Sequence, residues 1–358
     1  IGTWAFVGYP LWNQPWIIQP LSLFGIYGLD LLIMFGNYAL AKGIFVLLDK
    51  KWKWNDVPLI APRSAGRGLL AFGVLLIAWI GLSLSLYSAS TPGTPSVRIA
   101  AIQPDLPHAA HRDSSLSPEQ RLAILSSQTQ AAAALGVQIV VWPEMTLAFN
   151  PQVEHKLELQ ALAAETNTYI VIGYVLDNEQ GFRNEATVLA PSGEFLGIYG
   201  KTHPAVFSGE PMTVGRRNYP VYDLPLSRLA TMICFDANFT DVARSLSRQG
   251  AQIIAVPSLF GSSIAEMPYT QIVFRAIENR TTIVMADVAY NSAIVDPYGR
   301  VQRLVISPEG SQDTLVADVH IGDENTFYSQ FGDWLGWLCL AGMFFFAVAM
   351  ILTKHKKL

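Results

Sequence analysis

The chain has 358 residues, enough for one large domain with accessory segments. Charged residues make up only 15% of it, against roughly 25% in ordinary soluble domains, and the deficit is concentrated in a few long apolar stretches. This composition favours membrane segments. A net charge of −4, with no basic stripe interleaved with aromatic residues, argues against nucleic-acid binding.

The chain opens directly in aromatic-rich sequence. Its first residue is Ile1 rather than Met, and neither the charged segment nor the cleavage site of a signal peptide precedes the first apolar stretch. We therefore expect the sequence to be a fragment of a longer protein whose N-terminal part is missing.

Three apolar stretches have the length of a transmembrane helix, which takes about 20 residues. They cover residues 17–48, 68–88 and 334–353. The first is interrupted by Asp30, Asn37 and Lys42, and we allow for a part of it that lies in the membrane plane. A buried core helix is the alternative for each stretch.

These stretches divide the chain. We predict a membrane segment with two transmembrane helices over residues 1–95, a domain of alternating strands and helices over 96–325, and a C-terminal transmembrane helix with a basic tail over 326–358.

Lys and Arg residues gather on one side of the predicted helices. They are Lys50, Lys51, Lys53, Arg63 and Arg67 between the first two stretches, and Lys354, Lys356 and Lys357 in the tail. Cytoplasmic loops carry an excess of these residues. We therefore expect the segment 89–333 on the opposite side, which is the periplasm if the protein is a multi-pass protein of a bacterial inner membrane.

Strand and helix patterns alternate through residues 96–325. The predicted strands lie at 97–106, 137–145, 168–175, 228–235, 251–258, 281–288, 292–299 and 314–319, with a hairpin over 184–203. The predicted helices lie at about 118–135, 154–166, 240–250 and 265–280. Near-continuous apolar strands indicate an α/β fold with covered sheets, and the pattern alone also permits one doubly wound sheet.

Three residues that each end an apolar run can form a site for covalent catalysis. Glu144 ends the run IVVWPE, Lys201 follows GIYG, and Cys234 ends RLATMIC. A thiol serves as nucleophile, a carboxylate as its base, and an ammonium group stabilises an oxyanion. Taken singly, each has a structural alternative: a helix cap, a surface lysine, and a small buried side chain.

The chain has two cysteines, Cys234 and Cys339. Cys339 lies inside the last apolar stretch, so we expect no disulfide between them. Cys234 lies between a predicted strand and a predicted helix, where the next backbone N–H, that of Phe235, can donate to an oxyanion. The helix N-terminus and a nearby Lys are expected to lower the pKa of the thiol.

The order and local sequences of Glu144, Lys201 and Cys234 resemble those of the nitrilase (carbon–nitrogen hydrolase) superfamily. The flanking segments PWIIQPLSLFGIYG and NTFYSQFGDWLGW narrow the resemblance to its membrane branch, the bacterial apolipoprotein N-acyltransferases, and extend it over nearly the whole chain. The resemblance implies a four-layer αββα sandwich, in which two sheets face each other with helices outside both, flanked by transmembrane helices.

The resemblance also implies roles for individual residues. Glu144 matches the general base of a Trp-Pro-Glu motif, Lys201 the residue that holds the oxyanion, and Cys234 the nucleophile. Glu210, in the segment that follows Lys201, matches a second carboxylate that helps to position the site. The implied chemistry needs no metal and no organic cofactor.

Members of this branch transfer a fatty acyl group from a phospholipid to the α-amino group of the N-terminal diacylglyceryl-cysteine of an apolipoprotein, through a cysteine thioester. The expected partners are therefore a phospholipid donor and an apolipoprotein acceptor, and the protein is expected to be membrane-embedded. Trp4, Trp16, Trp334 and Trp337 can serve as interfacial anchors, as membrane-belt aromatics generally do.

Three segments depart from the family pattern. Phe235-Asp236 stands where the family has Tyr-Glu. PSLFGSS (257–263) replaces Ser-Asn-Asp-x-Trp-Phe-Gly, and ADVAYN (286–291) replaces Thr-Asn-x-Gly. The last two shape the acceptor side, so the resemblance defines the reaction type more closely than the acceptor.

Two alternatives stay open. A membrane-tethered amidase or nitrilase-type hydrolase would share the three residues but give the thioester to water. A membrane-anchored binding protein would keep the fold without catalysis, although the retention of all three residues argues against it.

Overall fold

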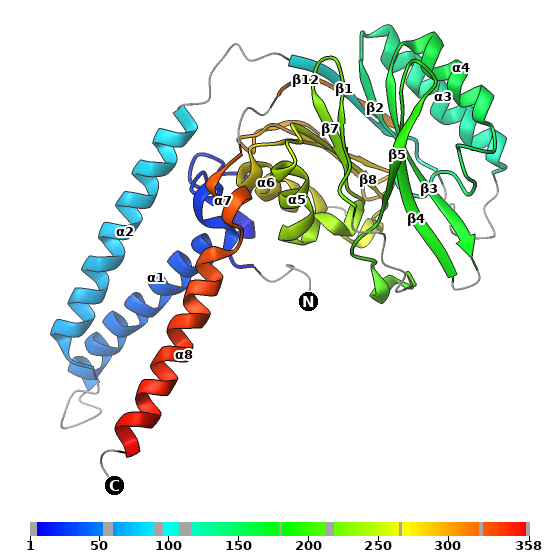
Figure 1. Cartoon of the computed structure of the whole chain (residues 1–358). Helices are drawn as coiled ribbons and strands as arrows, with labels where there is room; N and C mark the ends of the chain where they lie inside the picture. Colours follow the sequence, from blue (N-terminus) through cyan, green and yellow to red (C-terminus); the bar gives the residue numbers. More distant parts are fainter. Residues whose placement is uncertain are drawn as a thin grey trace.

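The computed structural model of the protein describes residues 6–52, 60–88, 96–106, 116–178, 181–211, 218–264, 267–321 and 325–355. Trp4, Lys53, Lys356 and Lys357 lie outside these ranges. A domain of strands and helices lies at one end of the molecule, and three long helices extend away from it (Figure 1).

Two six-stranded sheets form the domain. The first has the order β12-β1-β2-β3-β4-β5, with the strands Asp313–His320, Ser96–Gln103, Ile139–Val141, Tyr169–Asn178, Gly181–Leu189 and Phe195–Gly200. The second has the order β11-β10-β9-β8-β7-β6, with the strands Val301–Ile306, Asn291–Val295, Thr282–Asp287, Ile253–Ser258, Arg228–Thr231 and Val221–Asp223. In each sheet three inner strands pair in parallel, and the outer strands pair antiparallel.

The sheets face each other across a shared apolar core, to which β1 contributes Ile99 and β9 contributes Val284. The outer face of the first sheet is covered by α3 and α4, and that of the second by α5 and α6 (Figure 1). These helices are Pro118–Ala134, Lys156–Thr166, Thr240–Arg248 and Pro268–Asn279. Burial of both strand faces explains the near-continuous apolar runs. The predicted four-layer sandwich is confirmed, and a single doubly wound sheet is excluded.

Several short elements were absent from the sequence-based prediction. They are β6, β11, the helix α7 (Phe327–Phe331), and the 3-10 helices η1 (Tyr9–Leu11), η2 (Val206–Ser208), η3 (Cys234–Asn238) and η4 (Ser262–Ile264). The strand β11 is half-exposed at a sheet edge and carries Gln302 and Arg303, so it lacks the apolar run of a buried strand.

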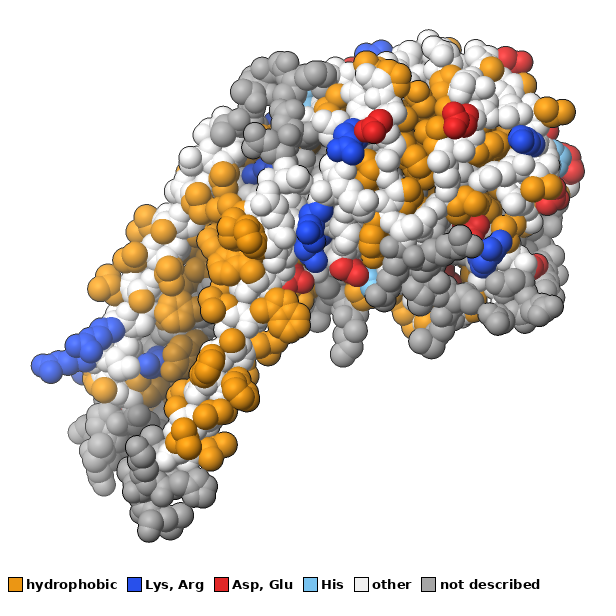
Figure 2. Space-filling view, viewed as in Figure 1, with side chains coloured by type: hydrophobic (Ala, Val, Ile, Leu, Met, Phe, Trp, Pro, Cys, Tyr) orange, Lys and Arg blue, Asp and Glu red, His pale blue; other side chains and the backbone are white. Residues whose placement is uncertain are grey.

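The described residues include three helices long and apolar enough to cross a membrane: α1 (Leu21–Trp52), α2 (Pro62–Ser88) and α8 (Trp334–His355). Apolar side chains are exposed along them (Figure 2). Lys50 and Lys51 lie in the last turn of α1, and Arg63 and Arg67 lie within the first six residues of α2, so these cations are near the helix ends far from the sheets. The division of the chain at residues 95 and 325 stays a prediction.

The helix α1 is broken where it reaches the domain. Gly25 has φ 62° and ψ −177°, values outside the helical region, and a Cβ at this position would collide with the ring of Tyr328. The next backbone N–H, that of Ile26, donates to Glu278 Oε1 on α6 at 2.9 Å. Glu278 Oε2 in turn lies 2.8 Å from Arg275 Nε. A buried ion pair therefore joins the first of the three long apolar helices to the domain.

Candidate active site

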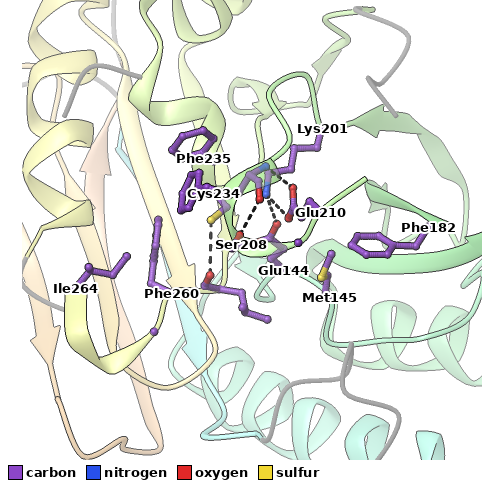
Figure 3. Close-up of a pocket in the computed structure, with 15 residues that line it drawn as sticks. Glu144, Met145, Phe182, Lys201, Ser208, Glu210, Cys234, Phe235, Phe260 and Ile264 are labelled. Atoms are coloured by element: carbon purple, nitrogen blue, oxygen red, sulfur yellow. Dashed lines mark hydrogen bonds and ion pairs between the residues drawn. The ribbon is translucent and has the colours of Figure 1, made fainter. Parts of the chain in front are cut away.

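The predicted catalytic residues lie where strands end. Glu144 follows β2 and Lys201 follows β5, both in the first sheet, while Cys234 follows β7 in the second. Because the two sheets face each other, these strand ends meet, and all three side chains line one cavity of about 430 Å³ (Figure 3). Glu210 and Phe235 line the same cavity.

Lys201 lies between two carboxylates. Its Nζ is 2.8 Å from Glu144 Oε1 and 2.7 Å from Glu210 Oε1. The side chains of Lys201 and Glu144 are only 3% and 2% exposed, so water screens their attraction poorly. The three groups therefore hold one another in a single arrangement at the floor of the cavity.

Burial controls the protonation of this cluster. Burial raises the pKa of Glu144, Lys201 lowers it, and the neighbouring Glu210 raises it again, with a net upward shift. Burial disfavours the ammonium form of Lys201, but the negative charges around it, chiefly that of Glu144, outweigh this effect and raise the pKa of Lys201. Lys201 thus stays cationic, and Glu144 binds a proton more readily than an ordinary carboxylate does.

Cys234 is the first residue of η3, three positions after the end of β7, and its backbone is left-handed. Its φ is 45°, which is uncommon for a residue with a side chain, and a left-handed turn at a strand end projects a nucleophile away from the sheet. The side chain lines the cavity, and Sγ donates to the carbonyl oxygen of Leu259 at 3.8 Å (Figure 3).

The predicted lowering of the thiol pKa is wrong. Burial raises the pKa of Cys234 well above its usual value, the carboxylate of Glu144 raises it further, and Lys201 opposes them only in part. The helix α5 begins at Thr240 rather than directly after the cysteine, so its N-terminal dipole does not lie at the thiol. A thiol in this environment needs a base, and the cavity supplies one in Glu144.

A sequence profile of the family described as carbon–nitrogen hydrolase matches residues 98–326. This range is more than half of the chain and contains every residue that lines the cavity. The chain belongs to the carbon–nitrogen hydrolase family.

Two relatives extend the similarity beyond the carbon–nitrogen hydrolase domain. A protein of Geobacter metallireducens named apolipoprotein N-acyltransferase is 28% identical over 99% of this chain and 70% of its own length. A protein of Thermotoga maritima with the same name is 26% identical over 94% of this chain and 65% of its own length. The chain therefore spans about two thirds of the length of these relatives. The resemblance expected from the sequence is confirmed.

A solved structure shares the fold. An amidase of the nitrilase superfamily from Nesterenkonia superimposes with a TM-score of 0.54 at 20% identity, over 68% of this chain and 96% of the amidase. The alignment leaves about a third of this chain unmatched. The likeness shows a nitrilase-type fold.

Asp236 is a residue of the carbon–nitrogen hydrolase domain to which the sequence assigned no role. Its buried carboxylate accepts hydrogen bonds from the backbone N–H groups of Ile233, Thr202 and His203. It also accepts one from the hydroxyl of Tyr199, at 2.7 Å. Burial outweighs these bonds and raises the pKa of Asp236 to about 6. The carboxylate ties the turn that carries Cys234 to the loop that follows Lys201. The sequence analysis noted Asp236 only as an aspartate at the position where the family has a glutamate.

Asn184 on β4 is a second residue that the sequence did not single out. Its Nδ2 donates to Glu144 Oε1 at 2.5 Å and to Glu210 Oε1 at 3.2 Å. Its backbone carbonyl accepts from the N–H of Lys201 at 2.9 Å. Asn184 therefore contacts all three charged members of the cluster. An asparagine within a predicted hairpin carries no signal of this role.

Apart from Ser208, the remaining side chains that line the cavity are apolar. They include Phe182, Phe235, Phe260 and Ile264 (Figure 3). Phe207 lines the cavity as well. The rings of Phe207 and Phe235 pack edge to face with centroids 5.2 Å apart, and Phe207 is 73% exposed. The cavity thus offers an apolar approach to a thiol that lies beside a charged floor.

Proposed function

We propose that the protein transfers a fatty acyl group from a membrane phospholipid to the N-terminal amine of a diacylglyceryl-cysteine lipoprotein, through a thioester on Cys234. One observation carries the proposal: the Glu144–Lys201–Glu210 cluster and the Cys234 thiol line one largely apolar cavity, in a chain whose described residues include three helices long and apolar enough to cross a membrane. The names of the two relatives support the same reaction.

The first half-reaction makes the acyl-enzyme. Glu144 takes the proton from Cys234 Sγ, and the sulfur attacks the ester carbonyl of the phospholipid, so that a C–S bond forms. Lys201 Nζ and the N–H of Phe235 stabilise the resulting oxyanion. The C–O bond to the glycerol then breaks, and Glu144 returns the proton to the leaving oxygen, which releases a lysophospholipid.

The second half-reaction consumes the thioester. The lipoprotein amine attacks the thioester carbonyl, and Glu144 takes a proton from the attacking nitrogen. The C–S bond breaks as the amide forms, and Cys234 Sγ recovers the proton. The same three side chains therefore serve both halves, and no redox partner is needed.

The membrane placement belongs to the proposal. We place α1, α2 and α8 across a bacterial inner membrane, with the carbon–nitrogen hydrolase domain on the periplasmic side, because Lys and Arg gather at the opposite helix ends. Trp337, 71% exposed near the start of α8, would then lie at the interface that faces the domain.

The test is mass spectrometry on the full-length protein purified from membranes and incubated with phospholipid. We expect a hydroxylamine-sensitive fatty-acyl adduct on Cys234 that disappears when a diacylated lipopeptide with a free amine is added. Cys234→Ala should abolish the adduct, while Cys339→Ala, an exposed thiol on α8, serves as the matched control and should retain it.

The other outcomes identify the alternatives. The adduct could instead disappear as fast with an N-acetylated lipopeptide, or with buffer alone, as with the free-amine lipopeptide. That result would identify the protein as a hydrolase, like the solved amidase, rather than a transferase. An adduct that persists in Cys234→Ala would contradict the mechanism. The absence of any adduct would favour a non-catalytic binding protein.

A further inference from the structure

Asp287, at the end of β9, is a fully buried carboxylate outside the catalytic cluster. Its Oδ1 accepts from the backbone N–H groups of Ala289 at 3.1 Å and Tyr290 at 2.8 Å, within the turn that leads to β10. Its Oδ2 accepts from the N–H of Phe260 at 2.8 Å. The two oxygens thus serve different partners, one in the local turn and one in a segment that lines the cavity.

The Phe260 N–H belongs to the same peptide unit as the Leu259 carbonyl. That carbonyl accepts the hydrogen bond from Cys234 Sγ at 3.8 Å. In a planar trans peptide the C=O and the N–H point in opposite directions, so a fixed N–H also fixes the direction of the carbonyl. A carboxylate bound to the N–H polarises the peptide as well, and this strengthens the carbonyl as an acceptor.

The segment around this peptide also contacts the proposed base. The backbone N–H of Glu144 donates to the carbonyl of Ser258 at 3.3 Å. Residues 258–260 therefore lie against both Glu144 and Cys234. Phe260 and Asp287 belong to the two segments, 257–263 and 286–291, in which the sequence departs from the family pattern, and one hydrogen bond connects them.

We propose that Asp287 is a positioning residue for the nucleophile: its carboxylate orients the Leu259–Phe260 peptide so that the carbonyl holds Cys234 Sγ in place. The inference rests on the proposed role of Cys234. Loss of this bond would free the peptide to rotate and allow the thiol to leave the position from which Glu144 takes its proton.

Asp287→Asn separates the two roles of the carboxylate. Its amide oxygen still accepts from the turn, but its NH₂ group, a donor, then faces the Phe260 N–H. Asp287→Ser is the second variant: a short hydroxyl can cap the same turn but does not extend to a second partner. The matched control is Ser292→Ala, which removes the hydroxyl that accepts from the Asp287 N–H at 3.0 Å and leaves the Phe260 contact intact.

The measurement is the rate at which iodoacetamide alkylates Cys234 in the folded full-length protein with Cys339→Ala as background, followed by peptide mass spectrometry at several pH values. We expect Asp287→Asn and Asp287→Ser to slow alkylation about tenfold, the effect of one lost charge-assisted hydrogen bond. Their rates should also rise more steeply with pH, because a thiol that has moved away from Glu144 can lose its proton only to hydroxide from the solution. Ser292→Ala should keep the parent rate and pH profile.

Two results would overturn the inference. One is an Asp287 variant that unfolds at the same temperature as the parent protein and whose Cys234 is alkylated at the parent rate with the parent pH profile. The other is an equal loss of rate in Ser292→Ala, which would make the effect one of general stability. Alkylation needs no phospholipid, so these rates judge Asp287 even if Cys234 never carries an acyl group, a result that would count against the proposed function alone.

Discussion

Two buried ion-pair clusters among the described residues differ in what surrounds them. In the first, Lys201 lies between Glu144 and Glu210, and in the second, Arg275 pairs with Glu278 at the junction with α1. Both have N–O distances of 2.7–2.8 Å, and their side chains are at most 3% exposed except that of Glu210, which is 12% exposed. The first borders a cavity of about 430 Å³ that also contains a thiol, whereas the second faces α1 and α7.

The junction cluster satisfies backbone groups. A helix interrupted at Gly25 leaves N–H groups without partners in the preceding turn, and Glu278 Oε1 accepts one of them from Ile26. The backbone carbonyl of Glu278 accepts from Thr326 Oγ1 at 2.5 Å, just before α7. Buried charge alone therefore does not identify an active site, and access of a substrate to a nucleophile distinguishes the two clusters.

The largest expected effect is in the catalytic cluster. Lys201→Met should reduce acyl-enzyme formation by about 10²–10³-fold, the usual consequence of losing an oxyanion donor. The rate of adduct formation on Cys234 in single-turnover experiments provides the measurement. A folded Lys201→Met protein that still acylates at the parent rate would remove the ammonium group from the mechanism.

The equivalent change at the junction should act on stability instead. Arg275→Met leaves the buried Glu278 without its cation and should lower the free energy of unfolding by about 3–5 kcal/mol. Thermal unfolding of the detergent-purified protein measures this. The acylation rate of the protein that remains folded should stay near the parent value, and a loss as large as that of Lys201→Met would erase the distinction between the clusters.

A smaller effect is expected at Asn184. Asn184→Ala removes one donor from both carboxylates and should raise the barrier to acylation by about 1–3 kcal/mol. Thr187→Ala on the same strand is the matched control, because it removes a bond of 2.6 Å to the Gly197 carbonyl without touching the cluster. Equal acylation rates in the two variants would reduce Asn184 to a structural role.

The last effect, which concerns pH, is the smallest when counted per pH unit. Burial raises the pKa of Glu278 from its ordinary value of 4.5 to about 7, although Arg275 opposes the shift. Between these values the folded state binds more protons than the unfolded state, so the free energy of unfolding falls as pH rises, by at most about 1.4 kcal/mol per pH unit for this group. Unfolding curves from pH 4.5 to 7 should show a shallower fall in Glu278→Gln, and an identical slope would contradict the assignment.

Runs of apolar residues in the sequence predicted the long helices and the central strands, because both kinds of element bury or expose continuous apolar surface. The long apolar stretches became α1, α2 and α8, and the buried runs became the central strands. The half-exposed β11 and the three-residue β6 escaped detection, because an edge strand needs no continuous apolar run.

The sequence by itself determined the α/β class and the places of Glu144, Lys201 and Cys234 at strand ends, since these follow from short segments read in order. The four-layer fold followed from the family resemblance that those segments carry, because the strand and helix pattern alone also permitted one doubly wound sheet. Tertiary structure alone decided how the side chains behave. The raised pKa of the Cys234 thiol comes from burial and from Glu144, 90 positions away in the chain. The hydrogen bonds from the Asn184 side chain to the two glutamates, and the one from the Phe260 N–H to Asp287, likewise join residues at least 26 positions apart. The interaction of Cys234 with Glu144 exists only once the two sheets have packed face to face, whereas the hydrogen bonds of Asn184 and Asp287 need the strands of one sheet to lie side by side. Packing then removes the water that would otherwise screen each charge.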